Sequence, residues 1–269
     1  MKIVLTSRRN YIQDPNILPG FQHLDLKDLN YEDLKVITYN SGITDPDKFL
    51  RQIDNYGIYS QAYIPFYLNA LLNYYREKGD IPNNRLEIYK FLIDSSFKAD
   101  TKRRKGTIVN VKLKGSKLLQ QVALVMQFTE KKELSVDDVA EMGFSEKDLE
   151  SCLSYVLFHK DDNDCYKFEQ NAFQLYYVAD YLSALAPEKV LDLVSYRSFG
   201  INRIKPEWLD AFELMLSVMP EGQQKSVLLE WTFENNIEAL VNLDTSYLDP
   251  IFCNKVFRTI LLDYKTKRI

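Results

Sequence analysis

The sequence predicts a mainly α-helical protein with a β-hairpin in its second half and one isolated strand at its start. Apolar residues recur at helical spacing through most of the 269 residues, and capping residues precede several of these runs. Two strand-like runs flank a polar turn at Asp161 to Asp164, which a helix interior would disfavour. The apolar run Ile3 to Leu5 ends in Arg8 and Arg9, the pattern of a buried strand that needs parallel neighbours.

Composition limits the classes of function. The chain has 46% hydrophobic and 27% charged residues, a net charge of −4 and a pI near 5.4. We therefore expect a globular protein without the basic field that attracts nucleic acid. No run of about 18 apolar residues is present, so no membrane span is expected. The cysteines and histidines show no metal-ligand spacing, which predicts reduced thiols, no metal site and a cytoplasmic location: Cys152, Cys165, Cys253, His23 and His159.

Residues 25–100 are expected to form a helical domain after a first segment, 1–24, that contains the isolated strand. Helical runs with start or stop signals extend over Tyr31 to Asn40, from Asp45 onward, from Ser60 through Pro65 to Gly79 and from Arg85 to Phe97. Asn30 can cap the first of these helices. Each run places apolar residues on one side, as the helices of a bundle do.

A very basic stretch follows, from Lys98 to Lys117, with Lys102 to Lys105 at its centre. Such a stretch could be a loop that binds phosphate. Blocks of like charge are more often solvated linkers between packed elements, so we favour the linker.

Residues 101–186 are expected to form a winged-helix domain. Helices are predicted around Leu118 to Phe128, after a cap at Ser135, and from Ser145 to near Val156. The hairpin comes next, and three short helices followed by a hairpin is the winged-helix order. Phe173 to Leu185 then return to a helix.

Residues 187–269 are expected to be helical pieces at irregular spacing, which suit the first units of a degenerate helical repeat region. The pieces are Pro187 to Tyr196, Pro206 to Met219, Gly222 to Phe233, Ile237 to Leu243 and Asn254 to Tyr264. The last helix has no recognisable cap, so we expect a packing partner for it outside this sequence.

The order of these elements resembles the carboxyl-terminal part of the nucleotide-binding module of NACHT-type STAND NTPases, a group of signalling switches that includes NOD-like receptors and bacterial antiviral proteins. "IVLTSRR" is similar to the family's sensor strand, and the resemblance places Arg8 near the nucleotide γ-phosphate. A guanidinium fixed at a strand end can bind phosphate with two parallel hydrogen bonds. "FQHLDLKDLNYEDLKVI" resembles the segment that leads from the family's core to its helical domain.

Two further motifs extend the resemblance. "YIPFYLNALLNYYREKGDIPNNRLEIYKFLIDSSF" is similar to a helix whose proline packs against the adenine base, which implies this role for Pro65. "YKFEQNAFQLYYVADYL" resembles the winged-helix signature of the family. Gln170 stands where the family has a histidine that contacts the diphosphate, and Leu175 stands where it has a glutamate. An amide can donate to phosphate but carries no charge, which implies weaker autoinhibition through this contact.

The catalytic centre of the family has no counterpart in the sequence. No GxxxxGKS or GxxxxGKT motif is present, nor an apolar strand that ends in acids able to hold magnesium. We therefore expect no catalytic residue in this chain, and no tight nucleotide binding or ATP hydrolysis by it alone. The resemblance implies an intact ATPase that binds ATP or ADP with magnesium, an upstream NTPase core as partner, and a homo-oligomer on activation.

Two alternatives remain open. A winged-helix DNA-binding regulator would place the helix from Ser145 in the major groove, where Glu146, Asp148 and Glu150 would face phosphate with the wrong sign. A protein-interaction module that uses no nucleotide would explain the missing phosphate-binding loop together with Gln170 and Leu175.

Overall fold

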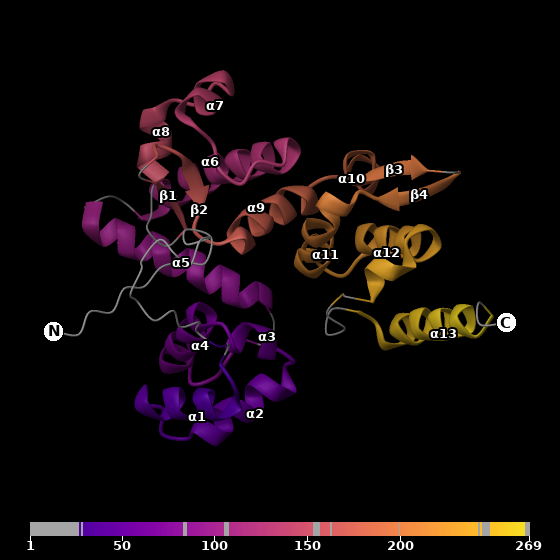
Figure 1. Cartoon of the computed structure of the whole chain (residues 1–269), viewed down its shortest axis with the longest axis horizontal. Coiled ribbons are helices and arrows are strands. Elements are labelled where there is room, and N and C mark those ends of the chain that lie inside the picture. Colours follow the sequence, from indigo (N-terminus) through magenta and orange to yellow (C-terminus); the bar gives the residue numbers. More distant parts are fainter. Residues whose placement is uncertain are drawn as a thin grey trace, which may run out of the picture.

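The computed structural model describes residues 27, 29–82, 85–104, 108–152, 157–161, 163–198, 200–241, 243 and 248–266. These residues form helices and two small antiparallel sheets, so the prediction of a mainly α protein is confirmed (Figure 1). The segment 1–24, with its expected strand and Arg8, lies outside the described residues.

The first two helices begin at side-chain caps that the sequence indicates. In α1 (Tyr31–Asn40), Asn30 Oδ1 accepts from Asp33 N at 3.0 Å and Asp33 Oδ2 accepts from Asn30 N at 2.9 Å. In α2 (Pro46–Asn55), Asp45 Oδ1 accepts from Lys48 N at 2.8 Å. These bonds satisfy first-turn amides that have no partner inside the helix, and the carboxylates also complement the helix dipole.

The next three helices are α3 (Tyr59–Ala62), α4 (Pro65–Lys78) and α5 (Arg85–Arg104). Pro65 occupies the first turn of α4, where its missing N–H costs no hydrogen bond. Gly79 ends α4 with φ of +74°, a left-handed conformation that favours glycine. The stop predicted at Gly79 is therefore confirmed, whereas the run predicted from Ser60 is divided into α3 and α4 before Pro65. Leu68 and Leu71 are among the buried residues of α4, and the helix packs against α3 and α5.

The predicted basic linker is wrong for most of its length. α5 continues to Arg104, and α6 (Ile108–Thr129) begins four residues later. Lysine and arginine have high helix propensity, whereas repulsion between like charges on a helix costs only a few tenths of a kcal/mol per pair. The domain boundary predicted after residue 100 consequently falls within α5.

The following elements are α7 (Val136–Glu141), α8 (Glu146–Cys152), β1 (Phe158–Lys160) and β2 (Tyr166–Phe168). Ser135 and Ser145 start the two helices by accepting from the backbone N–H of Asp138 and Asp148, each at 3.1 Å. The predicted hairpin is confirmed, since β1 and β2 pair antiparallel with Phe158 opposite Phe168. Leu134, between α6 and α7, adds an antiparallel bridge to Tyr166 in β2.

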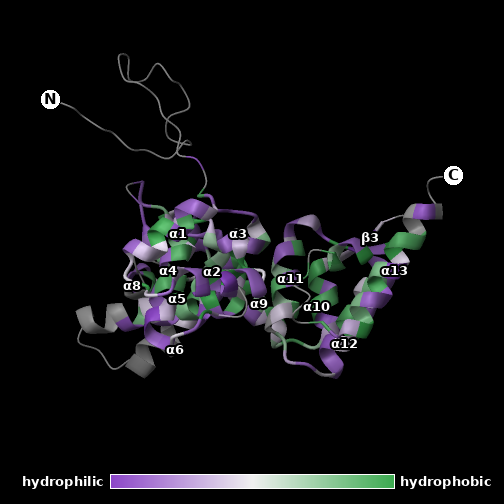
Figure 2. Ribbon diagram, turned by 90° about the horizontal axis from the view of Figure 1, so that it is seen from below, coloured by the Kyte–Doolittle hydropathy of each residue, from purple (hydrophilic) through white to green (hydrophobic). Residues whose placement is uncertain are grey.

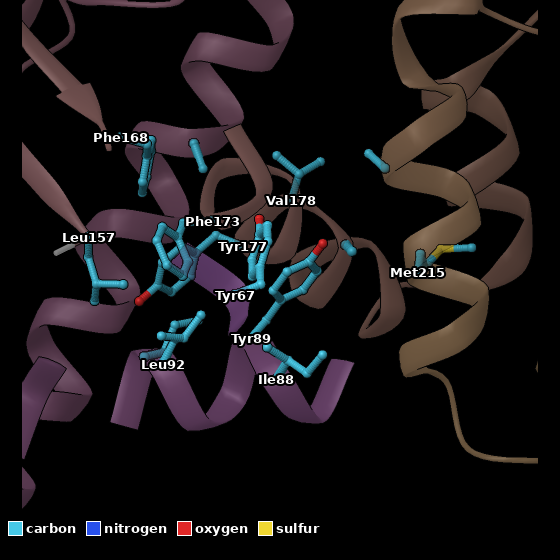
Figure 3. Packing of buried hydrophobic residues seen from close by; sticks show 14 of the residues in the cluster. Tyr67, Ile88, Tyr89, Leu92, Leu157, Phe168, Phe173, Tyr177, Val178 and Met215 are labelled. Carbon is cyan, nitrogen blue, oxygen red and sulfur yellow. The ribbon is translucent and has the colours of Figure 1, made fainter. Parts of the chain in front are cut away.

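The helix α9 (Asn171–Ser183) packs against several other elements, namely α5, α6, α11 and β2. Its buried residues are Phe173, Gln174, Tyr177, Val178, Ala179 and Leu182. Figure 3 shows Phe173 and Tyr177 of α9 beside Tyr67 of α4 and Tyr89 of α5. The rings of Tyr67 and Tyr89 lie 5.9 Å apart, and burial raises the pKa of Tyr67 well above its ordinary value.

The C-terminal elements are α10 (Pro187–Val194), β3 (Ser195–Ser198), β4 (Ile201–Ile204), the 3-10 turn η3 (Pro206–Trp208), α11 (Leu209–Val218), α12 (Gln223–Asn235), η4 (Ile237–Leu240) and α13 (Pro250–Thr266). The sequence does not predict the β3–β4 hairpin, and the helix expected to reach Tyr196 ends at Val194 instead. Gly200 has a φ of +83° and lies between Ser198 and Ile201, which pair with each other across the hairpin. The tight turn that this glycine permits favours a hairpin over the longer helix that the apolar pattern predicted.

No helix in the described ranges is long and apolar enough to cross a membrane.

Phe212→Ala should lower the free energy of unfolding by about 3–5 kcal/mol, because it removes a ring from the buried core and leaves a cavity in α11, a helix that packs against α9. Phe212 is fully buried. Urea unfolding followed by circular dichroism measures the loss. Phe257→Ala, at an exposed position on α13, is the matched control and should change stability by less than about 0.5 kcal/mol. Equal losses in the two variants would contradict the described core.

Candidate functional site

The starts of α4 and α9 lie next to each other. The rings of Phe66 and Phe173 meet edge to face, with centroids 6.0 Å apart. Phe66 directly follows Pro65, and Phe173 lies one turn after Gln170, which is the N-cap of α9. Pro65 and Gln170, the two residues to which the family resemblance gives a role in nucleotide binding, therefore lie at neighbouring helix starts. We call these two helix starts, residues 64–67 and 170–173, the N-terminal pair.

Neither helix of the N-terminal pair has a side-chain cap. At the starts of α1, α2, α7 and α8, an Asn, Asp or Ser side chain accepts a hydrogen bond from a first-turn backbone N–H, whereas α10 and α12 also have no such cap. The first amides of a helix and the positive end of its dipole attract anions when no side chain occupies the position. An anionic group is thus the chemical class of ligand that fits the N-terminal pair.

Apolar and aromatic side chains lie beside this position. Ile64 and Pro65 are exposed, and Tyr63 stacks on Tyr59 with ring centroids 6.0 Å apart. Tyr63 has φ of −72°, an ordinary helical value, so the backbone there does not require glycine. Burial raises the pKa of Tyr59 to about 12, and a hydrogen bond to Asp54 makes a smaller contribution in the same direction. A planar apolar group could pack on this surface while its anionic end reaches the helix starts.

Gln170 has an extended backbone and is half-buried. Its neighbour Glu169 has Oε2 at 3.3 Å from Nδ1 of His159 on β1, which is ion-pair distance without hydrogen-bond alignment. Glu169 places an acidic side chain directly before Gln170 in the sequence, and a negative charge there opposes an anion at Gln170. The sequence gives no role to the pair of His159 and Glu169.

A polar cluster that the sequence does not indicate joins α9 to α5 and α6. Gln120 Nε2 on α6 donates to Asp180 Oδ2 at 3.0 Å. Burial raises the pKa of Asp180, although Lys90 on α5 and the bond from Gln120 act in the opposite direction. Burial also raises the pKa of Tyr176 to about 12, with smaller contributions from Asp180 and Asp94. The cluster joins three helices that are far apart in sequence, α5, α6 and α9, so no local pattern indicates it.

The arrangement suits binding rather than bond cleavage. The N-terminal pair offers backbone amides, the amide side chains of Gln170 and Asn171, and an apolar surface, and its one phenol, Tyr67, is buried. Over the ranges that the structure describes, no group of three or more His, Cys, Asp and Glu side chains is placed to hold a metal ion.

Asp180→Asn should raise the free energy of unfolding at neutral pH. The folded carboxyl has a pKa above its ordinary value of 3.8, so the folded state binds more protons than the unfolded state between these two values. The wild-type protein should therefore lose stability as the pH rises through this window, whereas the variant, which keeps an oxygen for Gln120, should not. The advantage of the variant should disappear below about pH 3.8.

Urea unfolding at several pH values measures this difference. Asp192→Asn, at an exposed position on α10, is the control. A neutral-pH stability of Asp180→Asn equal to or below that of the wild type would show that ionised Asp180 is not penalised.

Comparison with known proteins does not assign the chain to a family. No protein-family model matches the chain, and no curated protein matches it. Four sequence motifs and the geometry of the N-terminal pair are therefore the features of the chain that point to a function.

Proposed function

We propose that the chain is the helical and winged-helix lid of a NACHT-type signalling switch, and that the N-terminal pair receives the nucleotide. The observation that supports this most is the meeting of two uncapped helix starts through Phe66 and Phe173. Each start contains a residue that the resemblance assigns to the nucleotide, Pro65 and Gln170. These assignments come from separate motifs, so their proximity is an independent reason to take them together.

The order of elements also supports the proposal. α6, the bridging Leu134, α7, α8 and the β1–β2 hairpin follow one another as the helices and strands of a winged helix do. The DNA-binding alternative is disfavoured, because Glu146, Asp148 and Glu150 on α8 are all exposed.

The proposed roles follow from the chemistry of each group. Pro65, with exposed Ile64, packs against an adenine ring, and the first amides of α4 and α9 attract the diphosphate. Gln170 donates its side-chain N–H to a phosphate oxygen without adding charge. The uncapped helix starts fit such an anion, and they would hold and orient it. Magnesium and a phosphate-binding loop from an upstream core would supply the phosphoryl chemistry in the intact ATPase.

Switching would follow from differential binding. A nucleotide held by both the core and the N-terminal pair favours the closed arrangement, and its exchange removes that preference. Since α9 contacts α5, α6 and α11, a movement of its start displaces several helices together. Opening would expose surfaces for homo-oligomerisation, and a role in antiviral defence belongs to the same proposal.

Gln170→Glu should weaken ADP binding about fivefold, because a carboxylate near 4 Å from phosphate costs about 1 kcal/mol even in water. Titration of the full chain with ADP, followed by backbone amide NMR, measures the weak affinity and maps the shifts to residues 64–67 and 170–173. Gln223→Glu is the matched control, because Gln223 begins α12 at another uncapped start. Shifts elsewhere, or equal effects of both substitutions, would reject the N-terminal pair as the site.

The intact gene product, purified from its source without added nucleotide, should release ADP when it is denatured. The reason is that the upstream core and the lid together enclose the nucleotide. Ion-exchange chromatography of the denatured supernatant identifies the nucleotide. Protein that releases no adenine nucleotide would instead favour a protein-interaction module.

A further inference from the structure

The last helix, α13, is attached to the protein along one side. Phe252 and Ile260 pack against the core, and Val256 is buried. Phe252 lies 6.1 Å from the ring of Phe233 on α12. Lys255 Nζ contacts Glu230 Oε2 at 2.8 Å and lies 4.2 Å from the centroid of Phe233. This cation between a carboxylate and a ring fixes how α13 is rotated about its axis.

The opposite side of α13 is also apolar. Ile251, Phe257 and Leu261 are 77%, 62% and 41% exposed. At 3.6 residues per turn, they fall within a sector of about 120° that also contains Asn254, Arg258 and Lys265. We call these six residues the α13 outer face. Figure 2 shows hydrophobic and hydrophilic segments alternating along this helix.

A helix that is apolar on both sides is normally covered on both. Three large apolar side chains on one face exceed the scattered exposure that is ordinary for a protein surface. The α13 outer face contains two cations, Arg258 and Lys265, both exposed, and no acid. This is a local excess of positive charge in a chain whose net charge is −4.

We propose that the α13 outer face docks an acidic amphipathic helix of a partner protein. Apolar residues of that helix, at i, i+3, i+4 and i+7 spacing, would cover Ile251, Phe257 and Leu261. Its carboxylates would pair with Arg258 and Lys265, and a guanidinium can bind one carboxylate with two parallel hydrogen bonds. The apolar contact supplies affinity, and the charge pairing supplies the choice of partner.

Charge disfavours two other occupants. A second copy bound face to face, with a two-fold axis through the middle of the α13 outer face, would place Arg258 next to its own counterpart, which repels it. A membrane surface favours helices whose cations flank the apolar stripe. Arg258 instead lies within the stripe, at an angle between Ile251 and Leu261, where insertion would pull it toward the acyl chains.

Two labelled helical peptides test the proposal. One presents leucines at i, i+3, i+4 and i+7 with flanking glutamates, and the other has lysine in place of each glutamate. Fluorescence anisotropy with the full chain at low salt should show the acidic peptide binding at least about tenfold more tightly, which is 1.4 kcal/mol. The double variant Arg258→Glu with Lys265→Glu should reverse this preference. Phe257→Ala should weaken both interactions several-fold.

Controls separate docking from unfolding and from nucleotide binding. Tyr39→Ala, at an exposed aromatic position on α1, should leave both affinities unchanged. Circular dichroism checks that each variant is folded, and no nucleotide is present, so the result does not depend on the proposed switch.

Three outcomes would overturn the proposal. The first is equal affinity for the two peptides, or a preference that the double charge variant does not change. The second is binding to phosphatidylserine vesicles that Phe257→Ala abolishes while neither peptide binds. The third is self-association in sedimentation experiments that the double charge variant abolishes, which would assign the face to a second copy.

Discussion

Burial of α9 is the packing constraint on which the rest of the structure depends. Five of its apolar side chains are almost fully excluded from solvent: Phe173, Tyr177, Val178, Ala179 and Leu182. Each large apolar side chain of this kind contributes about 1.5–3 kcal/mol when it is buried. These residues do not share one narrow stripe, so the helix needs neighbours on several sides. α5, α6 and α11 provide them, and Phe66 of α4 closes the contact at the start of the helix.

This packing links groups along one rigid element. The first turn of α9 belongs to the N-terminal pair, whereas Asp180, near the other end, accepts a hydrogen bond from Gln120. Burial makes the Asp180 carboxylate costly to ionise and so raises its pKa, and that cost opposes the apolar packing around it. In the switch that we propose, a ligand at the start of α9 would act through this helix on α5 and α6, with which Asp180 interacts.

Polar capping and apolar exposure divide the molecule into surfaces with different chemistry. Side chains of the protein already satisfy the starts of α1, α2, α7 and α8. The starts of α4 and α9 have no such bond, as is also true of α10 and α12, but they meet through Phe66 and Phe173, and the amides of two neighbouring helix starts suit an anion. The α13 outer face presents exposed apolar residues with cations among them. One surface is thus suited to a small anionic ligand and the other to an acidic helix.

The sequence by itself determined the features that depend on neighbouring residues. Asn30 and Ser135 start helices through bonds that span three residues, Gly79 ends one through its own backbone freedom, and the polar turn after Lys160 closes a hairpin. Only the tertiary structure decided that Phe66 meets Phe173, that Asp180 meets Gln120, and which side of α13 is covered. The physical reason is that these contacts join segments distant in sequence. Their geometry follows from how whole helices pack, and local propensity does not encode it.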